Sequence, residues 1–293
     1  MIWQELGLPG LADVHVHFLP HSVMRKVWAY FDAAETNYGR AWPIEYRLPE
    51  PERLQILRHL GVRAFPSLVY PHKPGMADWL TTWALDFAET QPDVVPTGTF
   101  FPEPGAAASV ARALERGARI FKGHVQVGAY DPRDPLLDPV WGQLADAQVP
   151  IILHCGDGPI PGPFTGVGPI RTVLERHPTL RLVVAHMGMP RYEDFLDLAE
   201  QFPALALDTT MAFTDFAESG SPFPAERRPQ LRELGLAGRV VLGSDFPNIP
   251  HPYGHQLDAL VRLDLGDDWL RQVLWHAPAA MLGVAGRVPE PGV

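Results

Sequence analysis

The chain has 293 residues, of which 46% are hydrophobic, enough for one large α/β domain that we expect to span residues 1–293. Its 24 basic and 34 acidic residues give a formal charge of −10 without a dense basic cluster, which argues against nucleic acid as a partner. No apolar run approaches the roughly 20 residues that span a bilayer, so we expect no membrane partner. The single cysteine, Cys155, suits a reducing compartment, and we expect a cytoplasmic protein.

Eight short runs rich in β-branched or aromatic residues are candidate strands, at 11–17, 62–69, 94–100, 118–125, 149–154, 180–186, 204–210 and 239–245. Amphipathic patterns typical of helices lie between or after them, near 50–60, 77–90, 105–117, 138–147, 168–177, 191–202, 225–236, 254–265 and 267–283. Apolar strands that alternate with helices indicate parallel strands buried on both faces. The sequence therefore predicts an α/β fold, a (β/α)8 TIM barrel.

Two connections are long enough to shape the mouth of such a barrel. The first runs from Phe18 to Gly61 and contains an aromatic-rich stretch at 28–46, so we expect an extended first βα insertion that forms a lid or a pocket wall. Within it, Arg47 is a candidate for binding a substrate carboxylate, although a solvated surface arginine is the more common role. The second is the Gly/Pro-rich segment 156–169, which follows the fifth predicted strand.

Potential metal ligands stand near the ends of four of these runs. His15 and His17 are two residues apart, so on a strand both point to one face. His154, His186 and Asp245 each close a separate run. Taken singly, each has an ordinary structural explanation, such as a buried hydrogen-bonded histidine or a capping aspartate. Because the carboxyl ends of parallel strands meet at one end of a barrel, together they predict a metal site.

Five motifs occur in a characteristic order: DVHVH at 13–17, FKGH at 121–124, ILHCG at 152–156, VAHMG at 184–188 and GSDFP at 243–247. On these motifs the chain resembles the amidohydrolase superfamily of metal-dependent TIM-barrel enzymes. It is most similar to the amidohydrolase-related branch, which includes the aminocarboxymuconate-semialdehyde decarboxylase group. A closing motif at 275–283 also resembles the superfamily, with His276 where its members commonly show Asn.

The resemblance implies that His15, His17, His154 and Asp245 hold one divalent ion per chain, and that His186 and Asp245 transfer protons. Imidazole and carboxylate ligands suit Zn²⁺, with Mn²⁺ as the alternative. The implied reaction is attack of metal-bound hydroxide on the carbonyl of an amide, a lactone or a related small-molecule substrate. A homodimer is possible, since barrels of this branch often pair.

Several alternatives stay open at this point. Binuclear relatives bridge two metal ions with a carboxylated lysine or a glutamate on the fourth strand, where this chain has Lys122. We expect Lys122 to be a free amine that binds a substrate carboxylate, with His124 as a second substrate-binding residue on the same face. The same site could serve a non-oxidative decarboxylase of an aromatic or unsaturated carboxylate. A barrel that binds metal without catalysis is the alternative of another class.

Overall fold

The computed structural model describes residues 1–286 of the chain. Its strands are β1 Leu11–Ala12, β2 Val62–Pro66, β3 Val94–Val95, β4 Thr97–Thr99, β5 Ile120–His124, β6 Ile151–His154, β7 Leu182–Val184, β8 Ala206–Asp208 and β9 Val240–Val241. They pair in parallel as β1-β2-β3 and as β4-β5-β6-β7-β8-β9. Every residue of β5 and β6 is buried, as expected for parallel strands covered on both faces.

The third predicted strand, 94–100, is divided at Pro96 into β3 and β4. Proline has no backbone N–H with which to continue a ladder. As a result, β3 pairs with β2 and β4 pairs with β5. The prediction of one continuous strand was therefore wrong at this position, and the division explains why the barrel contains nine strand segments where eight were expected.

The barrel closes between its first and last strands. The ladder with β2 becomes irregular at Ala12, and on the other side of the first strand the backbone N–H of Val14 donates to the carbonyl of Leu242 at 2.9 Å. An isolated parallel bridge then joins Val16 to Phe246. The regular ladder with β2 ends at Ala12, short of the predicted 11–17, but Asp13 still donates to the carbonyl of Ala64 and Val16 still accepts from the amide of Leu68. The contacts on the other side of this segment place His15 and His17 beside the segment that carries Asp245.

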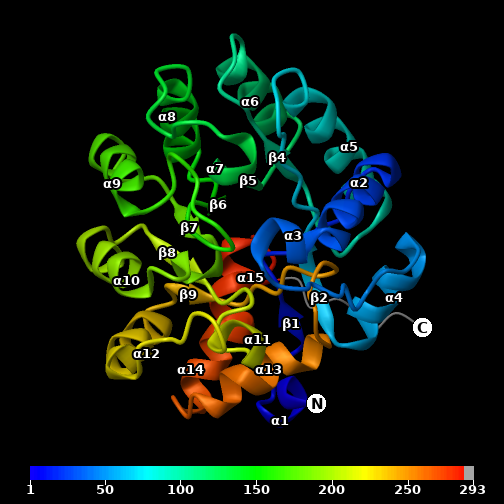
Figure 1. Ribbon diagram of the computed structural model, residues 1–293, viewed down its shortest axis with the longest axis vertical. Coiled ribbons are helices and arrows are strands. Elements are labelled where there is room, and N and C mark those ends of the chain that lie inside the picture. Colours follow the sequence, from blue (N-terminus) through cyan, green and yellow to red (C-terminus); the bar gives the residue numbers. More distant parts are fainter. Residues whose placement is uncertain (287–293) are drawn as a thin grey trace.

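The helices are α1 Ile2–Glu5, α2 His21–Asp32, α3 Ala34–Tyr38, α4 Glu50–His59, α5 Ala77–Thr90, α6 Ala106–Glu115, α7 Val125–Gly128, α8 Asp138–Asp146, α9 Val167–Arg176, α10 Tyr192–Gln201, α11 Asp215–Glu218, α12 Arg228–Leu236, α13 Tyr253–Arg262, α14 Asp267–Arg271 and α15 Ala277–Met281. Short 3₁₀ turns cover Ala185–Gly188 (η1) and Ala225–Arg227 (η2), and a π turn, Gln272–His276 (η3), interrupts the helix predicted at 267–283. The remaining predicted helices are present, and the longer ones surround the strands (Figure 1).

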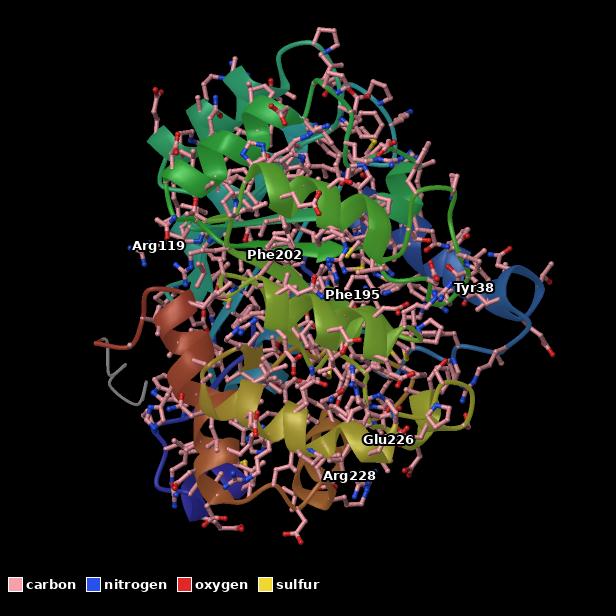
Figure 2. All side chains as sticks on the ribbon, turned by 90° about the vertical axis from the view of Figure 1, so that its left-hand side faces the viewer. Tyr38, Arg119, Phe195, Phe202, Glu226 and Arg228 are labelled. Atoms are coloured by element: carbon pink, nitrogen blue, oxygen red, sulfur yellow. The ribbon has the colours of Figure 1, made fainter. Side chains whose placement is uncertain are left out.

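The two ends of the barrel differ in what covers them. Arg119 directly precedes β5 and therefore marks the amino end of the strands, whereas Tyr38 ends α3 in the connection after β1. These two residues lie at opposite sides of the molecule in Figure 2. The connection that contains α2 and α3 therefore lies at the carboxyl end of the strands, where the histidines are. None of the helices in residues 1–286 is long and apolar enough to cross a membrane.

Candidate functional site

His15, His17 and Asp245 come together at the carboxyl end of the barrel. One ligand atom from each lies within 4.8 Å of the other two. Oδ1 of Asp245 is 3.0 Å from Nε2 of His17 and 3.6 Å from Nε2 of His15. Both histidines are buried, and Asp245 retains 14% side-chain exposure. Three of the four predicted metal ligands therefore form one group, which we call the ligand group.

Hydrogen bonds fix which ring nitrogen of each histidine faces the ligand group. Nδ1 of His15 lies 2.9 Å from a carboxylate oxygen of Asp208, and Nδ1 of His17 lies 2.8 Å from the carbonyl oxygen of Leu68. Both partners are acceptors, so each Nδ1 carries the hydrogen and each Nε2 presents a lone pair. Together with the carboxylate of Asp245, these lone pairs form a donor set that fits a divalent cation.

The electrostatic environment keeps the ligand group in its metal-binding form. Burial would raise the pKa of Asp245, but the hydrogen bond and charge of His17, together with the charge of His15, lower it below the usual value. Burial, followed by the charge of Lys122, lowers the pKa of His15 well below the usual range. A carboxylate and a neutral imidazole are the states that a metal ion requires.

Two residues of the site have a backbone conformation that is unusual for a side chain with a Cβ. The φ angle is +71° at Asp245 and +55° at His186. Such angles cost on the order of 1–3 kcal/mol and persist only where the surroundings impose them. Here the amide of Asp245 donates to the carbonyl of His15 at 2.8 Å, and the amide of His186 donates to Asp208 at 2.8 Å. Strain of this kind is typical of functional positions.

His154 lies beside the ligand group without joining it. Its Nε2 is 2.8 Å from the carbonyl oxygen of Gly158, which leaves Nδ1 as its acceptor atom. Its ring stacks on that of His124 at 4.0 Å and lies 4.7 Å from that of His186. Burial, with the charges of His186 and Lys122, lowers the pKa of His154 to about 3.

Lys122 points into the ligand group. Its Nζ lies 3.0 Å from Nε2 of His15 and is therefore a donor to the lone pair that a metal ion would use. The side chain is 1% exposed, and burial lowers its pKa to about 8, although the charges of Asp208 and Asp245 oppose this shift. Lys122 is thus a buried side chain that contacts the ligand group through His15.

Six aromatic rings form a closed circuit next to the ligand group, in which each ring centroid lies between 4.0 and 5.6 Å from the next. In order, the members of this aromatic circuit are His15, His17, Tyr70, His124, His154 and His186. The circuit brings together the five histidines predicted to lie at the site, which come from four strand ends, and adds Tyr70 from a fifth.

A family model described as "Amidohydrolase" matches residues 12–284. The chain belongs to this amidohydrolase family. The match confirms the family resemblance drawn from the five motifs. It also includes every residue of the ligand group and of the aromatic circuit.

Solved structures of similar fold cover nearly the whole amidohydrolase chain. An uncharacterized TIM-barrel protein from Bordetella bronchiseptica is 19% identical, with a TM-score of 0.72 over 94% of this chain and 99% of that one. A putative 2-pyrone-4,6-dicarboxylic acid hydrolase from Pseudomonas putida is 16% identical, with a TM-score of 0.59 over 94% and 98%. A 5-carboxyvanillate decarboxylase from Novosphingobium aromaticivorans, complexed with manganese and 4-hydroxy-3-methoxy-5-nitrobenzoic acid, is 13% identical, with a TM-score of 0.64 over 94% and 97%. No curated protein matches the sequence. These likenesses establish the TIM-barrel fold.

Arg47, the remaining predicted site residue, lies apart from these groups. It makes two hydrogen bonds of 2.8 Å to the carboxylate of Asp32, and its side chain is 43% exposed. Its guanidinium also lies 5.5 Å from the ring of Trp28. The structure therefore pairs Arg47 with residues of the same connection between β1 and β2, which corresponds to the alternative of a solvated surface arginine.

Sequence reasoning missed two residues that contact the candidate site. Asp208 ends β8 and orients both His15 and His186, and the signal that identified Asp245, an acidic residue at the end of an apolar run, was present there too. Tyr70 follows the second predicted strand and carries no such signal, because a tyrosine at a strand end is most often packing.

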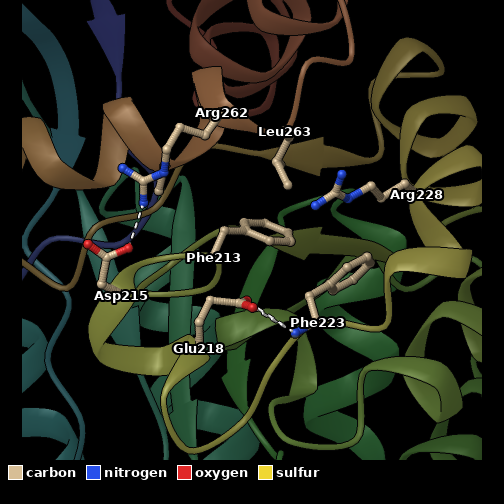
Figure 3. A pocket seen from close by; sticks show the side chains of 8 residues that line it. Phe213, Asp215, Glu218, Phe223, Arg228, Arg262 and Leu263 are labelled. Atoms are coloured by element: carbon tan, nitrogen blue, oxygen red, sulfur yellow. Dashed lines mark hydrogen bonds and ion pairs between the residues drawn. The ribbon is translucent and has the colours of Figure 1, made fainter.

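A separate pocket of about 180 Å³ lies outside the aromatic circuit, lined in part by Phe213 and Phe223 (Figure 3). Three of its four charged residues have partners within residues 1–286. Asp215 pairs with Arg262 at 3.0 Å, and Glu218 accepts from the amide of Phe223 at 3.1 Å. These contacts satisfy Asp215, Glu218 and Arg262 without a ligand.

Proposed function

We propose that this amidohydrolase is a metal-dependent hydrolase that cleaves an amide, lactone or related carbonyl bond of a small molecule. The observation that supports the proposal is the convergence of His15, His17 and Asp245 with lone pairs directed at one point. The family match supports it independently.

In this proposal one divalent ion, Zn²⁺ or Mn²⁺, is held by His15, His17 and Asp245, with His154 as a fourth ligand. When bound, the ion would polarise a carbonyl group and lower the pKa of water. His154 would coordinate through Nδ1 if its hydrogen bond to Gly158 is kept. The manganese in the related decarboxylase makes Mn²⁺ a reasonable first ion to test.

We assign proton transfer to His186 and Asp245. The ring of His186 lies 5.2 Å from that of His15, and its backbone is fixed by Asp208, so its imidazole is held at the edge of the ligand group. An imidazole at this place can take a proton from water and return it to a leaving group. Lys122 and His124, which also face the ligand group and the aromatic circuit, are assigned to substrate binding.

The insertion after β1 would form a wall of the substrate site. The indole N–H of Trp42 donates to the carbonyl of Asn248 at 2.7 Å, and that of Trp28 donates to the Asn248 side chain at 3.2 Å. Asn248 in turn donates its backbone N–H to the carbonyl of Asp245. These contacts connect the insertion directly to the loop that carries a proposed metal ligand.

A second candidate function is non-oxidative decarboxylation at the same site. The specific observation in its favour is Lys122, whose buried amine in the ligand group would bind a substrate carboxylate. In this reaction the bond between a substrate carbon and its carboxylate would break, CO₂ would leave, and a proton would take its place on that carbon, with no ester or amide hydrolysed.

The test combines metal content with turnover. Protein loaded with Zn²⁺ or Mn²⁺ is incubated with a panel of lactones, amides and aromatic carboxylates, while acid release and CO₂ release are followed separately. We expect about one metal equivalent, hydrolysis without CO₂, and loss of turnover in Asp245→Asn. The matched control is Asp268→Asn, since Asp268 is 86% exposed. Release of CO₂ would select the decarboxylase, and full activity of Asp245→Asn would overturn both assignments.

A further inference from the structure

The aromatic circuit has two halves with different surroundings. His15 and His17 belong to the ligand group, whereas Tyr70, His124 and His154 form an arc on the other side. Counted in either direction, Tyr70 and His186 are three places apart, which makes them opposite members. Each of them contacts one histidine of the ligand group: His186 lies 5.2 Å from His15, and Tyr70 lies 5.6 Å from His17, between ring centroids.

Tyr70 is held in place by the segment that also orients His17. The carbonyl of Leu68 accepts from Nδ1 of His17, and the amide of Leu68 donates to the carbonyl of Val16 at 2.9 Å. The Tyr70 ring lies edge-on to that of His17 at 5.6 Å and is tilted over that of His124 at 4.9 Å. The ring is thus fixed between a metal-ligand candidate and a substrate-binding candidate.

The hydroxyl of Tyr70 differs from other buried tyrosine hydroxyls. It makes no hydrogen bond within residues 1–286, yet it is not sealed from solvent as the unpartnered hydroxyls of Tyr130 and Tyr192 are. Burial, followed by the charge of Asp245, raises its pKa, so the hydroxyl remains a hydrogen-bond donor.

We propose that Tyr70 contacts the substrate, and that its hydroxyl donates a hydrogen bond to an oxygen of a planar carboxylate bound against the aromatic circuit. This inference rests on the proposed function for the location of the substrate. The chemistry of the lining supports the substrate class: the amine of Lys122 and the hydroxyl of Tyr70 are donors, and the imidazole rings offer flat faces. Both features are complementary to a flat molecule that carries oxygen anions.

The test measures binding and needs no turnover. The probe is 4-hydroxy-3-methoxy-5-nitrobenzoate, a planar carboxylate, titrated calorimetrically into manganese-loaded protein. We expect Tyr70→Phe to raise the Kd about tenfold, the effect of losing one hydrogen bond to a charged group. The matched control is Tyr192→Phe, which removes a buried, unpartnered hydroxyl on α10 that packs against Phe223, and we expect its Kd to stay within about twofold of wild type. Manganese content and Tm are measured for all three proteins.

The outcomes separate this inference from the proposed function. An unchanged Kd in Tyr70→Phe would overturn the inference, as would loss of manganese from that variant, which would show a structural role. Failure of the wild type to bind the probe would overturn the assigned substrate class. If the wild type hydrolyses a member of the panel while Tyr70→Phe binds the probe normally, the proposed function stands and the inference fails. If Tyr70→Phe binds the probe more weakly than the wild type while the wild type turns over no substrate of the panel, the inference stands and the proposed function fails.

Discussion

Nδ1 of His15 and Oδ2 of Asp208 lie 2.9 Å apart, although 193 residues separate them in the chain. The other oxygen of Asp208 accepts from the amide of His186 at 2.8 Å and from that of Thr210 at 3.1 Å. One buried carboxylate therefore fixes the ring orientation of a proposed metal ligand and the backbone of a proposed proton-transfer group. Partners of this kind commonly matter almost as much as the ligands themselves.

The first prediction concerns this carboxylate. Asp208→Asn removes the negative charge that stabilises the Nδ1–H form of His15, so we expect metal affinity to fall roughly 10- to 100-fold with the barrel intact. Competition with a metal-binding dye measures the affinity, and circular dichroism checks the fold. Asp268→Asn at the surface is the control. Equal metal affinities in the two variants would show that Asp208 does not orient His15.

A second prediction follows from the contact between Lys122 and His15. Nζ of Lys122 lies 3.0 Å from Nε2 of His15 and donates to the lone pair that a bound metal ion would use. Lys122→Met removes this competing donor and a positive charge, so we expect metal to bind about tenfold more tightly, an effect of roughly 1.4 kcal/mol. We expect substrate turnover to fall in the same variant. Elemental analysis gives the number of ions, and a drop from two to one would instead identify Lys122 as a bridging ligand.

The third prediction concerns Gly243, which packs so closely against Thr210 and His15 that we expect no side chain to be tolerated there. A Cβ added at Gly243 would meet Thr210 and would lie 2.9 Å from Cβ of His15. We expect Gly243→Ala to destabilise the fold by about 1–3 kcal/mol and to weaken metal binding, because His15 must move. The matched control is Gly254→Ala in α13, where a Cβ meets nothing within 4 Å, and a gain of about 0.5–1 kcal/mol is expected. Urea denaturation measures the free energy of unfolding of both variants. A Gly243→Ala protein as stable as the wild type, with intact metal binding, would contradict the packing argument.

The fourth prediction concerns acid stability and His251. Burial lowers its pKa, helped by the charge of His255, although a hydrogen bond to the Pro252 carbonyl and the charge of Glu45 oppose the shift. In the unfolded chain His251 has its usual pKa of about 6.5 and is protonated below it, whereas in the native state it stays neutral to lower pH. The free energy of unfolding therefore falls as pH decreases from 7 toward the native pKa.

His251→Gln removes this proton uptake, so we expect a smaller loss of Tm between pH 7 and pH 5 than in the wild type. The difference in slope approaches about 1.4 kcal/mol per pH unit at most. His276→Gln alters an exposed histidine and serves as the control. Parallel Tm profiles for the wild type and His251→Gln would show that His251 is not held in its neutral form.

Much of the fold was predictable from local patterns. Apolar runs and amphipathic segments alternate, and parallel strands covered by helices require that alternation, so the barrel and the order of its helices followed from the sequence. Exceptions arose where one residue changes local geometry. Pro96 divides a predicted strand, and the π turn at Gln272–His276 interrupts a predicted helix. Helices α2 and α3 carried no clear signal, since tertiary contacts such as that of Trp28 with Asn248 stabilise the insertion.

The sequence by itself determined which residue types stand at the strand ends, and hence the family and the candidate ligands His15, His17 and Asp245. Only the tertiary structure decided which atoms meet. The hydrogen bonds that set the tautomers, the turn of His154 toward Gly158, and the places of Asp208 and Tyr70 depend on contacts between segments far apart in the chain. A sequence pattern fixes the face and the end of a strand, but ring orientation depends on partners that other strands supply.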